Sequence, residues 1–110
     1  MSDLPVVAIR LKEARLVARL SQKQLGMQAG MDPSIASARV NHYERGRHVP
    51  DLLTVQRLAK VLGVPAPYLY AADDDLARWI LAYDRVTSSE RKAIMRKANP
   101  KGTRAKSSSR

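Results

Sequence analysis

Apolar residues recur at spacings of three and four along most of the chain, which is the period of helices that bury one face. The first such segment runs from Pro5 to Arg19. Its predicted buried face consists of Val7, Leu11, Ala14 and Ala18. Arg15 falls on the same face. Because an unpaired buried guanidinium is costly, Arg15 predicts a carboxylate partner in the core. A second apolar strip indicates that this helix is covered on more than one side; it consists of Ile9, Leu16 and Leu20.

A helix over residues 33–44 is predicted from Asp32 and Pro33, an N-cap residue followed by proline at the first helical position. Gly46 predicts its end. The predicted buried stripe of this helix consists of Ala36, Val40 and Tyr43. The opposite face is small and polar, and consists of Ser34, Ala38, Asn41 and Arg45, with Ser37 and His42 at its sides and Arg39 nearer the buried edge.

Two shorter helices flank this one. Ser21 and Gln24 have the spacing of a capping box, which predicts a helix over 22–28. On the other side, Asp51 opens a helix that Gly63 closes. The predicted core positions of this fourth helix are Leu52, Val55, Leu58, Ala59 and Leu62.

The remaining chain predicts two more helices after a short helical turn over 65–70. A run of aspartates precedes an amphipathic stripe, which is more typical of ordinary core than of a ligand pocket. The stripe consists of Leu76, Trp79, Ile80 and Tyr83. Thr87 and Glu90 form a second capping box, which predicts a helix over 88–98. Residues 99–110 have no apolar period and predict a disordered cationic tail.

Together these elements predict an all-α protein with three parts. A five-helix domain is expected over 5–70, a helical extension over 71–98, and the tail over 99–110. The composition agrees, because 110 residues with no Phe and one Trp build their core mainly from Leu, Val, Ile and Ala, which suits helices.

Several classes of function are poorly supported. The absence of cysteine excludes disulfides and thiolate chemistry. His42 and His48 lie six residues apart without a carboxylate cluster, so neither a metal site nor another cofactor is expected. No catalytic Ser/His/Asp grouping and no phosphate-binding glycine loop is present, which argues against an enzyme. No apolar run has membrane-spanning length, so we expect a soluble, cytoplasmic protein with no membrane partner.

Charge points to a polyanionic partner. The formal net charge is +10. Residues 1–70 contribute +5, residues 71–86 contribute −2, and residues 87–110 contribute +7. Such positive charge at both ends of an acidic segment favours nucleic acid.

The stretch from Ile9 to Tyr70 resembles the Cro-type, or XRE-type, helix-turn-helix regulators of bacteria and their phages. The resemblance rests on Leu11 and Arg15, on LSQKQL at 20–25, AGM at 29–31, YERG at 43–46, Pro50 and LAKVLGV at 58–64. It implies a five-helix, repressor-like fold whose second and third helices form the helix-turn-helix. It also implies a structural ion pair between Arg15 and Glu44.

The sequence departs from the family pattern by about four extra residues between Gly30 and Glu44, or about one helical turn. Either the third helix begins early at Pro33 or the preceding turn is longer.

The resemblance implies a sequence-specific, double-stranded-DNA-binding transcriptional regulator in the bacterial cytoplasm, near the nucleoid. The third helix, about 33–44, would enter the major groove. The predicted base-contacting residues are Ser37, Asn41 and His42, with Ser34, Ala38 and Arg39 as further candidates. The predicted contacts to the DNA backbone come from Gln22, Lys23, Arg45 and Arg47.

The extension over 71–98 has two candidate functions. Pairing of two copies would place two recognition helices about 34 Å apart on one face of DNA, which predicts a homodimer. Alternatively, the extension binds another protein, as in an antitoxin that sequesters a toxin and also represses its own promoter.

Overall fold

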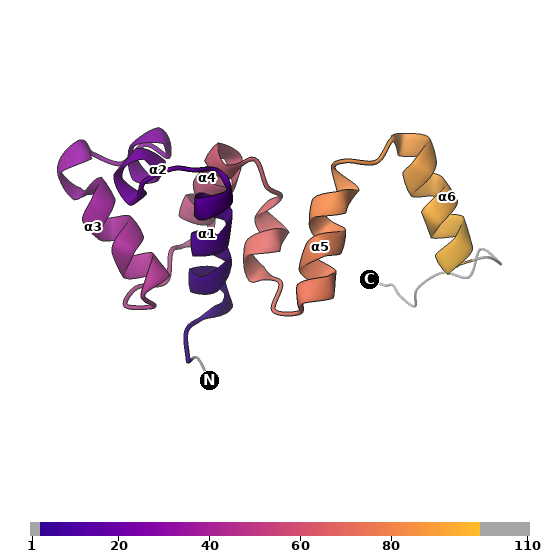
Figure 1. Cartoon of the computed structure of the whole chain (residues 1–110), viewed down its shortest axis with the longest axis horizontal. Helices are drawn as coiled ribbons and strands as arrows, with labels where there is room; N and C mark the ends of the chain where they lie inside the picture. The colour runs from indigo at the N-terminus through magenta and orange to yellow at the C-terminus, as the bar shows by residue number, and fades with distance from the viewer. Residues whose placement is uncertain (1–2, 100–110) are drawn as a thin grey trace.

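The structure is a computed structural model that describes residues 3–99, and it is all-helical within that range (Figure 1). The elements in chain order are α1 (Val6–Val17), α2 (Gln22–Gln28), α3 (Pro33–Glu44), α4 (Leu52–Leu62), the 3-10 helix η1 (Ala66–Tyr70), α5 (Asp74–Tyr83) and α6 (Ser88–Ala98). The predicted all-α class is confirmed. The tail predicted over 99–110 lies, from residue 100 onward, outside the described residues.

The core is built where α1, α2, α3, α4 and η1 meet. Its largest fully buried side chains are Leu11, Leu25, Val40, Val55, Leu58 and Leu69. The predicted stripe of α3 is confirmed, since Ala36, Val40 and Tyr43 are all buried. Burying such side chains supplies roughly 1.5–3 kcal/mol each, which holds the short helices together.

Helix α1 is shorter than predicted. It ends at Val17, and Arg19 adopts a positive φ of 60° that turns the chain toward α2. Ala18 is therefore exposed and not part of the core. The second covered strip holds only at Leu20, which packs partly against the core, whereas Ile9 and Leu16 are exposed.

Helix α4 buries a narrower face than predicted. Val55, Leu58 and Ala59 are buried and Leu62 packs partly against the core. Leu52, predicted to be a core position, is 60% exposed. It lies at the first residue of the helix, directly after the Asp51 cap, where no neighbouring element covers it.

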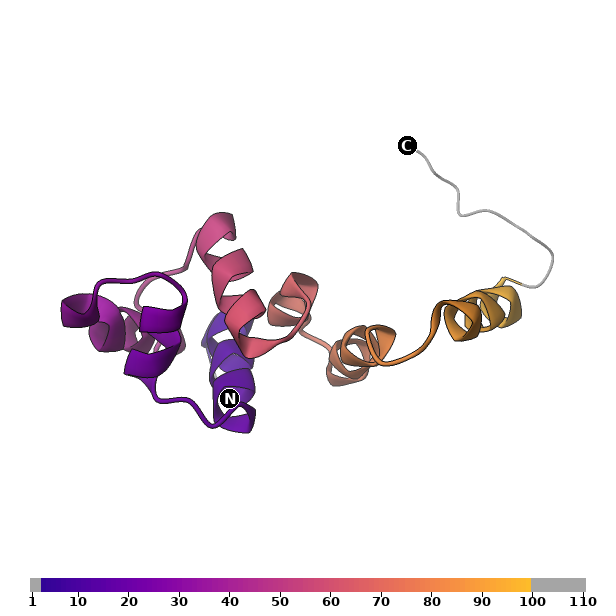
Figure 2. The same cartoon turned by 90° about the horizontal axis from the view of Figure 1, so that it is seen from above.

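Of the two C-terminal helices, α5 packs one side against this core and α6 lies apart from it. Both views place α2 and α3 at one end of the molecule and α6 at the other, with α5 next to η1 (Figures 1 and 2). The expectation that the α5 stripe is ordinary core is wrong: Leu76, Trp79 and Tyr83 are all more than half exposed. Ala77 is the residue of α5 that is buried, and Ile80 is partly buried.

Arg10 fixes the start of α5 to α1, a role the sequence reading did not assign. Its Nε donates to the Ala71 carbonyl at 2.8 Å, and its Nη2 donates to Ala72 and Asp74. Nη1 pairs with Glu13 at 3.0 Å. Burial opposes the charge, but the hydrogen bonds and attraction of Asp74 and Glu13 outweigh it and raise the pKa of Arg10. Arg10 lies three residues after Val7 on the predicted buried face, and this helical spacing is the signal in the sequence by which its inward position could have been found.

Candidate nucleic-acid interface

The N-terminus of α3 is set by a local cap. The Asp32 carboxylate accepts hydrogen bonds from the Ser34 amide at 2.8 Å and from the Ser34 hydroxyl at 2.6 Å. These bonds lower the pKa of Asp32, the hydroxyl contributing most. The helix thus begins at Pro33, which answers the question of the extra residues: they lengthen α3 at its start. The Ser34 hydroxyl proton is already used, so toward DNA this oxygen offers an acceptor.

The outward face of α3 is open over most of its length. Ser37, Ala38 and Arg39 are exposed, while Asn41 and His42 are half-buried. Arg39 was expected nearer the buried edge of α3, and its side chain is exposed beside the buried Tyr43. An exposed Arg39 reaches outward without first having to leave a core contact.

Gln22 joins the start of α2 to the middle of α3. Its side-chain Nε2 donates to Asn41 Oδ1 at 3.2 Å and to Glu44 Oε1 at 3.1 Å. Both hydrogens of this amide are then engaged, because a primary amide nitrogen carries two. The bond fixes which way the Asn41 carboxamide faces, and leaves the Asn41 Nδ2 hydrogens for another acceptor. The sequence reading placed Gln22 on phosphate and missed this contact, which joins residues nineteen apart.

The ion pair that the resemblance implied is present in the structure. Arg15 Nε donates to Glu44 Oε2 at 2.6 Å and Nη2 to Oε1 at 3.0 Å. Arg15 Nη1 also donates to the Leu20 carbonyl at 2.9 Å. Both side chains are buried, so the pair ties α1 to the last turn of α3 where water screens little.

Three predicted phosphate-binding cations surround the helix-turn-helix. Lys23 lies in the first turn of α2, Arg45 is the C-cap of α3, and Arg47 follows in the next loop. All three are exposed. The bonds from Gln22 to Asn41 and Glu44 bring the start of α2 to the last turns of α3, so these three cations gather toward the C-terminal end of α3.

A shallow groove of about 570 Å³ runs beside α3 toward α4. His42 and His48 meet edge to face in it, with ring centroids 5.0 Å apart. Arg39, Val49 and Thr54 also line it. The sequence reading did not assign His48, Val49 or Thr54 to this surface: His48 and Val49 are loop residues that follow no helical period, and Thr54 lies in the first turn of α4, outside the predicted helix-turn-helix.

Two other kinds of site are absent from the described range. Residues 3–99 contain no group of three His, Cys, Asp or Glu side chains placed to hold a metal ion. In the same range, no helix combines the length and the apolar character needed to cross a bilayer.

Comparisons with known proteins find similarity over the same part of the chain. A helix-turn-helix family model matches residues 11–69. Among solved structures, the crystal structure of the transcriptional regulator BswR is similar, with 48% sequence identity and a TM-score of 0.78. The similarity covers 84% of this chain and 92% of that chain. No curated protein sequence gives a significant match.

Proposed function

The chain belongs to the XRE-type helix-turn-helix family and is a DNA-binding transcriptional regulator, and we propose that it reads a specific double-stranded sequence by placing α3 in the major groove. The observation that carries this proposal is the bond from Gln22 to Asn41. A polar side chain held in one orientation on an exposed helix face is what selective recognition of a base edge requires.

Asn41 makes the central base contact in this proposal. A bidentate contact to adenine needs the carboxamide oxygen to accept from N6 and the nitrogen to donate to N7. Asn41 Oδ1 has a second lone pair beyond the one that Gln22 uses. Neighbouring side chains complete the reading surface: Ser34, Ser37, Ala38, Arg39 and His42. Ala38 offers a methyl group suited to thymine, and His42 offers a donor suited to guanine.

Contacts to the DNA backbone fix the register of α3 in the groove. We assign these to Lys23, Arg45 and Arg47, which are exposed where the start of α2 meets the end of α3. The Gln22 side chain instead acts as a positioning group, since both of its Nε2 hydrogens are engaged. Its backbone amide, at the first position of α2, has no partner within the helix and suits a phosphate oxygen.

The proposed active form is a cytoplasmic homodimer. A single short recognition helix touches few base pairs, whereas two copies related by a two-fold axis read two half-sites one turn of DNA apart, or a whole multiple of it. Whether the protein represses or activates its target follows from where that site lies relative to a promoter.

Selection of bound oligonucleotides from a random pool, at a stated salt concentration, tests this function. We expect an enriched palindromic motif. Asn41→Ala is expected to lose about 1–3 kcal/mol of preference at one base pair of each half-site, because the bidentate contact is removed. Lys23→Ala is the matched control: it is expected to weaken binding evenly across sequences. A pool that yields no motif would overturn specific recognition.

A further inference from the structure

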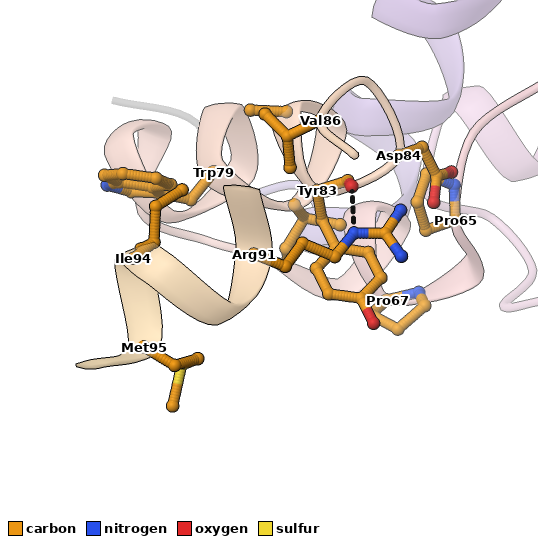
Figure 3. A pocket seen from close by; sticks show the side chains of 11 residues that line it. Pro65, Pro67, Trp79, Tyr83, Asp84, Val86, Arg91, Ile94 and Met95 are labelled. Atoms are coloured by element: carbon orange, nitrogen blue, oxygen red, sulfur yellow. Dashed lines mark hydrogen bonds between the residues drawn. The ribbon is translucent and has the colours of Figure 1, made fainter. Parts of the chain in front are cut away.

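Helix α6 lacks the packing that would stabilise it within one chain. It has 11 residues, and none of its side chains is buried. Its visible attachment to α5 is Arg91, whose Nε donates to the Tyr83 carbonyl at 2.8 Å while its guanidinium lies 3.9 Å from the Tyr83 ring centre (Figure 3). Isolated helices of this length are marginal in water. The capping box at Thr87 favours the helix. A helix as short as α6 nevertheless needs a surface to pack against in order to be stable.

An apolar groove of about 500 Å³ lies between α5 and α6 (Figure 3). It is lined almost entirely by carbon, with Pro67, Trp79, Tyr83, Val86, Ile94 and Met95 as its main side chains. Trp79, Tyr83 and Met95 are each about 60% exposed, at 61%, 58% and 62%. Large apolar side chains gathered in one exposed place mark an interaction surface more often than an ordinary exterior.

The two helices beside the groove carry opposite charges. Helix α5 begins at Asp73, Asp74 and Asp75, which are all exposed. Helix α6 carries Arg96 and Lys97 in its last turn, and within residues 88–98 its four cations outnumber the one anion. Figure 1 shows that α6 runs back in the direction opposite to α5. Each copy therefore presents an apolar groove, with an acidic helix start one turn beyond its Trp79 edge and a basic helix end directly after Met95.

We propose that the groove between α5 and α6 binds α6 of a second copy of this chain, reciprocally. The inference rests on the homodimer of the proposed function and assigns its interface. With α6 of one copy antiparallel to α5 of the other, Arg96 and Lys97 lie near the Asp73–Asp75 end across the two-fold axis. The same contact occurs twice, as a two-fold interface requires.

Charge complementarity favours a second copy over another occupant. Trp79 lies about one helical turn from Asp75, so an occupant that fills the groove and continues along α5 past Trp79 meets the aspartates, which an apolar face followed by a cationic end suits. Helix α6 has both, with Ile94 and Met95 one helical turn or less from Arg96 and Lys97. DNA, being anionic, is repelled from Asp73–Asp75, so this surface is separate from the α3 face.

The apolar part of the interface is tested by Ile94→Glu in the full chain, with sedimentation velocity at micromolar concentration. Two carboxylates would enter the dimer core, and we expect the dimer dissociation constant to rise about a hundredfold or more. Met27→Glu is the control, since Met27 is an exposed apolar residue of α2, and α2 lies at the end of the molecule opposite α6 (Figure 1). The control is expected to remain dimeric. Circular dichroism reports whether either variant changes the helix content.

Charge reversal tests the pairing without disturbing the apolar groove. Asp75 is suitable because Asp73 caps α5 and Asp74 binds Arg10, whereas Asp75 pairs with Arg78 on the surface. Asp75→Lys, and separately Arg96→Glu with Lys97→Glu, are each expected to weaken self-association about tenfold through two like-charge contacts. An equimolar mixture of the two variants is expected to restore the dimer as a heterodimer, because both of its contacts are again between opposite charges.

The outcomes separate the inference from the function it rests on. A dimer that Ile94→Glu leaves intact, or a mixture that forms no heterodimer, overturns the assigned interface while the homodimer stands. A chain that stays monomeric both free and on DNA overturns the interface and the homodimer together. Loss of dimer in Ile94→Glu, with retained affinity for a single half-site, supports the inference.

Discussion

Arg15 and Glu44 show how one residue pair positions α3, the proposed DNA-reading helix. The guanidinium meets the carboxylate through two bonds, and its third nitrogen bonds the Leu20 carbonyl. Gln22 donates to the same carboxylate. Within residues 3–99 no buried side-chain nitrogen or oxygen lacks a partner. The pair thus fixes the last turn of α3 against α1 and the start of α2, next to Asn41.

Replacing Arg15 by Met is expected to cost about 3–5 kcal/mol of stability, because it leaves the Glu44 carboxylate buried without its cation. That is a large share of a typical small-domain stability of roughly 5–15 kcal/mol. Chemical denaturation monitored by circular dichroism measures the change.

The double variant Arg15→Met, Glu44→Met serves as the control for this pair. Removing both charges relieves the uncompensated burial, so we expect most of the lost stability to return. DNA affinity is not expected to return with it, since Gln22 loses one of its two acceptors. If the stability losses of Arg15→Met and Glu44→Met, each measured alone, simply add in the double variant, the two residues do not couple as described.

At the scale of elements, the helix-turn-helix depends on a close crossing of α2 and α3. A Cβ placed on Gly26 would lie 2.8 Å from the Ala36 Cβ and 3.0 Å from the Ala36 Cα and carbonyl oxygen. Two of these atoms are backbone, so they move only if α3 itself moves. The glycine therefore sets the distance between the two helices.

Gly26→Ala is expected to lower stability by about 1–3 kcal/mol, as overpacking of a close contact does. It is also expected to weaken specific DNA binding beyond what the stability loss explains, because α3 shifts relative to Lys23. Thermal unfolding and a binding titration measure the two effects.

Gly63→Ala is the comparison for this prediction. Gly63 has φ 70° at the end of α4, with no atom within 4 Å of an added Cβ. We expect a cost of about 1 kcal/mol from the left-handed backbone conformation and no separate effect on DNA binding. Equal loss of DNA affinity in both variants would contradict the assigned role of Gly26.

At the scale of the whole molecule, the chain is elongated and separates its two proposed surfaces. Its principal extents are 55 × 28 × 27 Å, with α3 and α6 at opposite ends (Figure 2). The cluster around Arg10 joins the two parts, since it bonds α1 to the residues just before α5. Through this cluster the orientation of the extension follows that of the DNA-binding domain.

We expect DNA binding to depend more steeply on salt than the phosphate contacts of α3 and its neighbouring residues alone would give. About six phosphate contacts give a log–log slope of about −5. Replacing Lys101, Arg104, Lys106 and Arg110 by Ser removes the four cations of residues 99–110 and is expected to make the slope shallower. Fluorescence anisotropy over a salt series measures it.

A scrambled order of residues 99–110 is the control, because it keeps the charge and length of the tail. It is expected to retain the full slope, since counterion release depends on charge rather than order. A neutralised tail with an unchanged slope would show that the tail makes no contact with phosphate.

The sequence by itself determined the helices and most of their ends, because these depend on neighbours a few residues away. Asp32, Asp51 and Thr87 each bond an amide two or three positions on, as their spacing predicted. Helices over 22–28, 33–44 and 88–98 have the predicted bounds. Local charge likewise identified Arg15 as a residue in need of a partner, and the family resemblance supplied Glu44.

Only the tertiary structure decided which apolar faces are covered and which polar groups meet. Leu52, Leu76 and Trp79 have the periodicity of core residues, yet each is more than half exposed. Helical period marks a face as apolar, but whether that face meets its own chain or a partner depends on where the other helices pack. The contact of Gln22 with Asn41 has the same origin, because it exists only where the close crossing of α2 and α3 brings the two amides together.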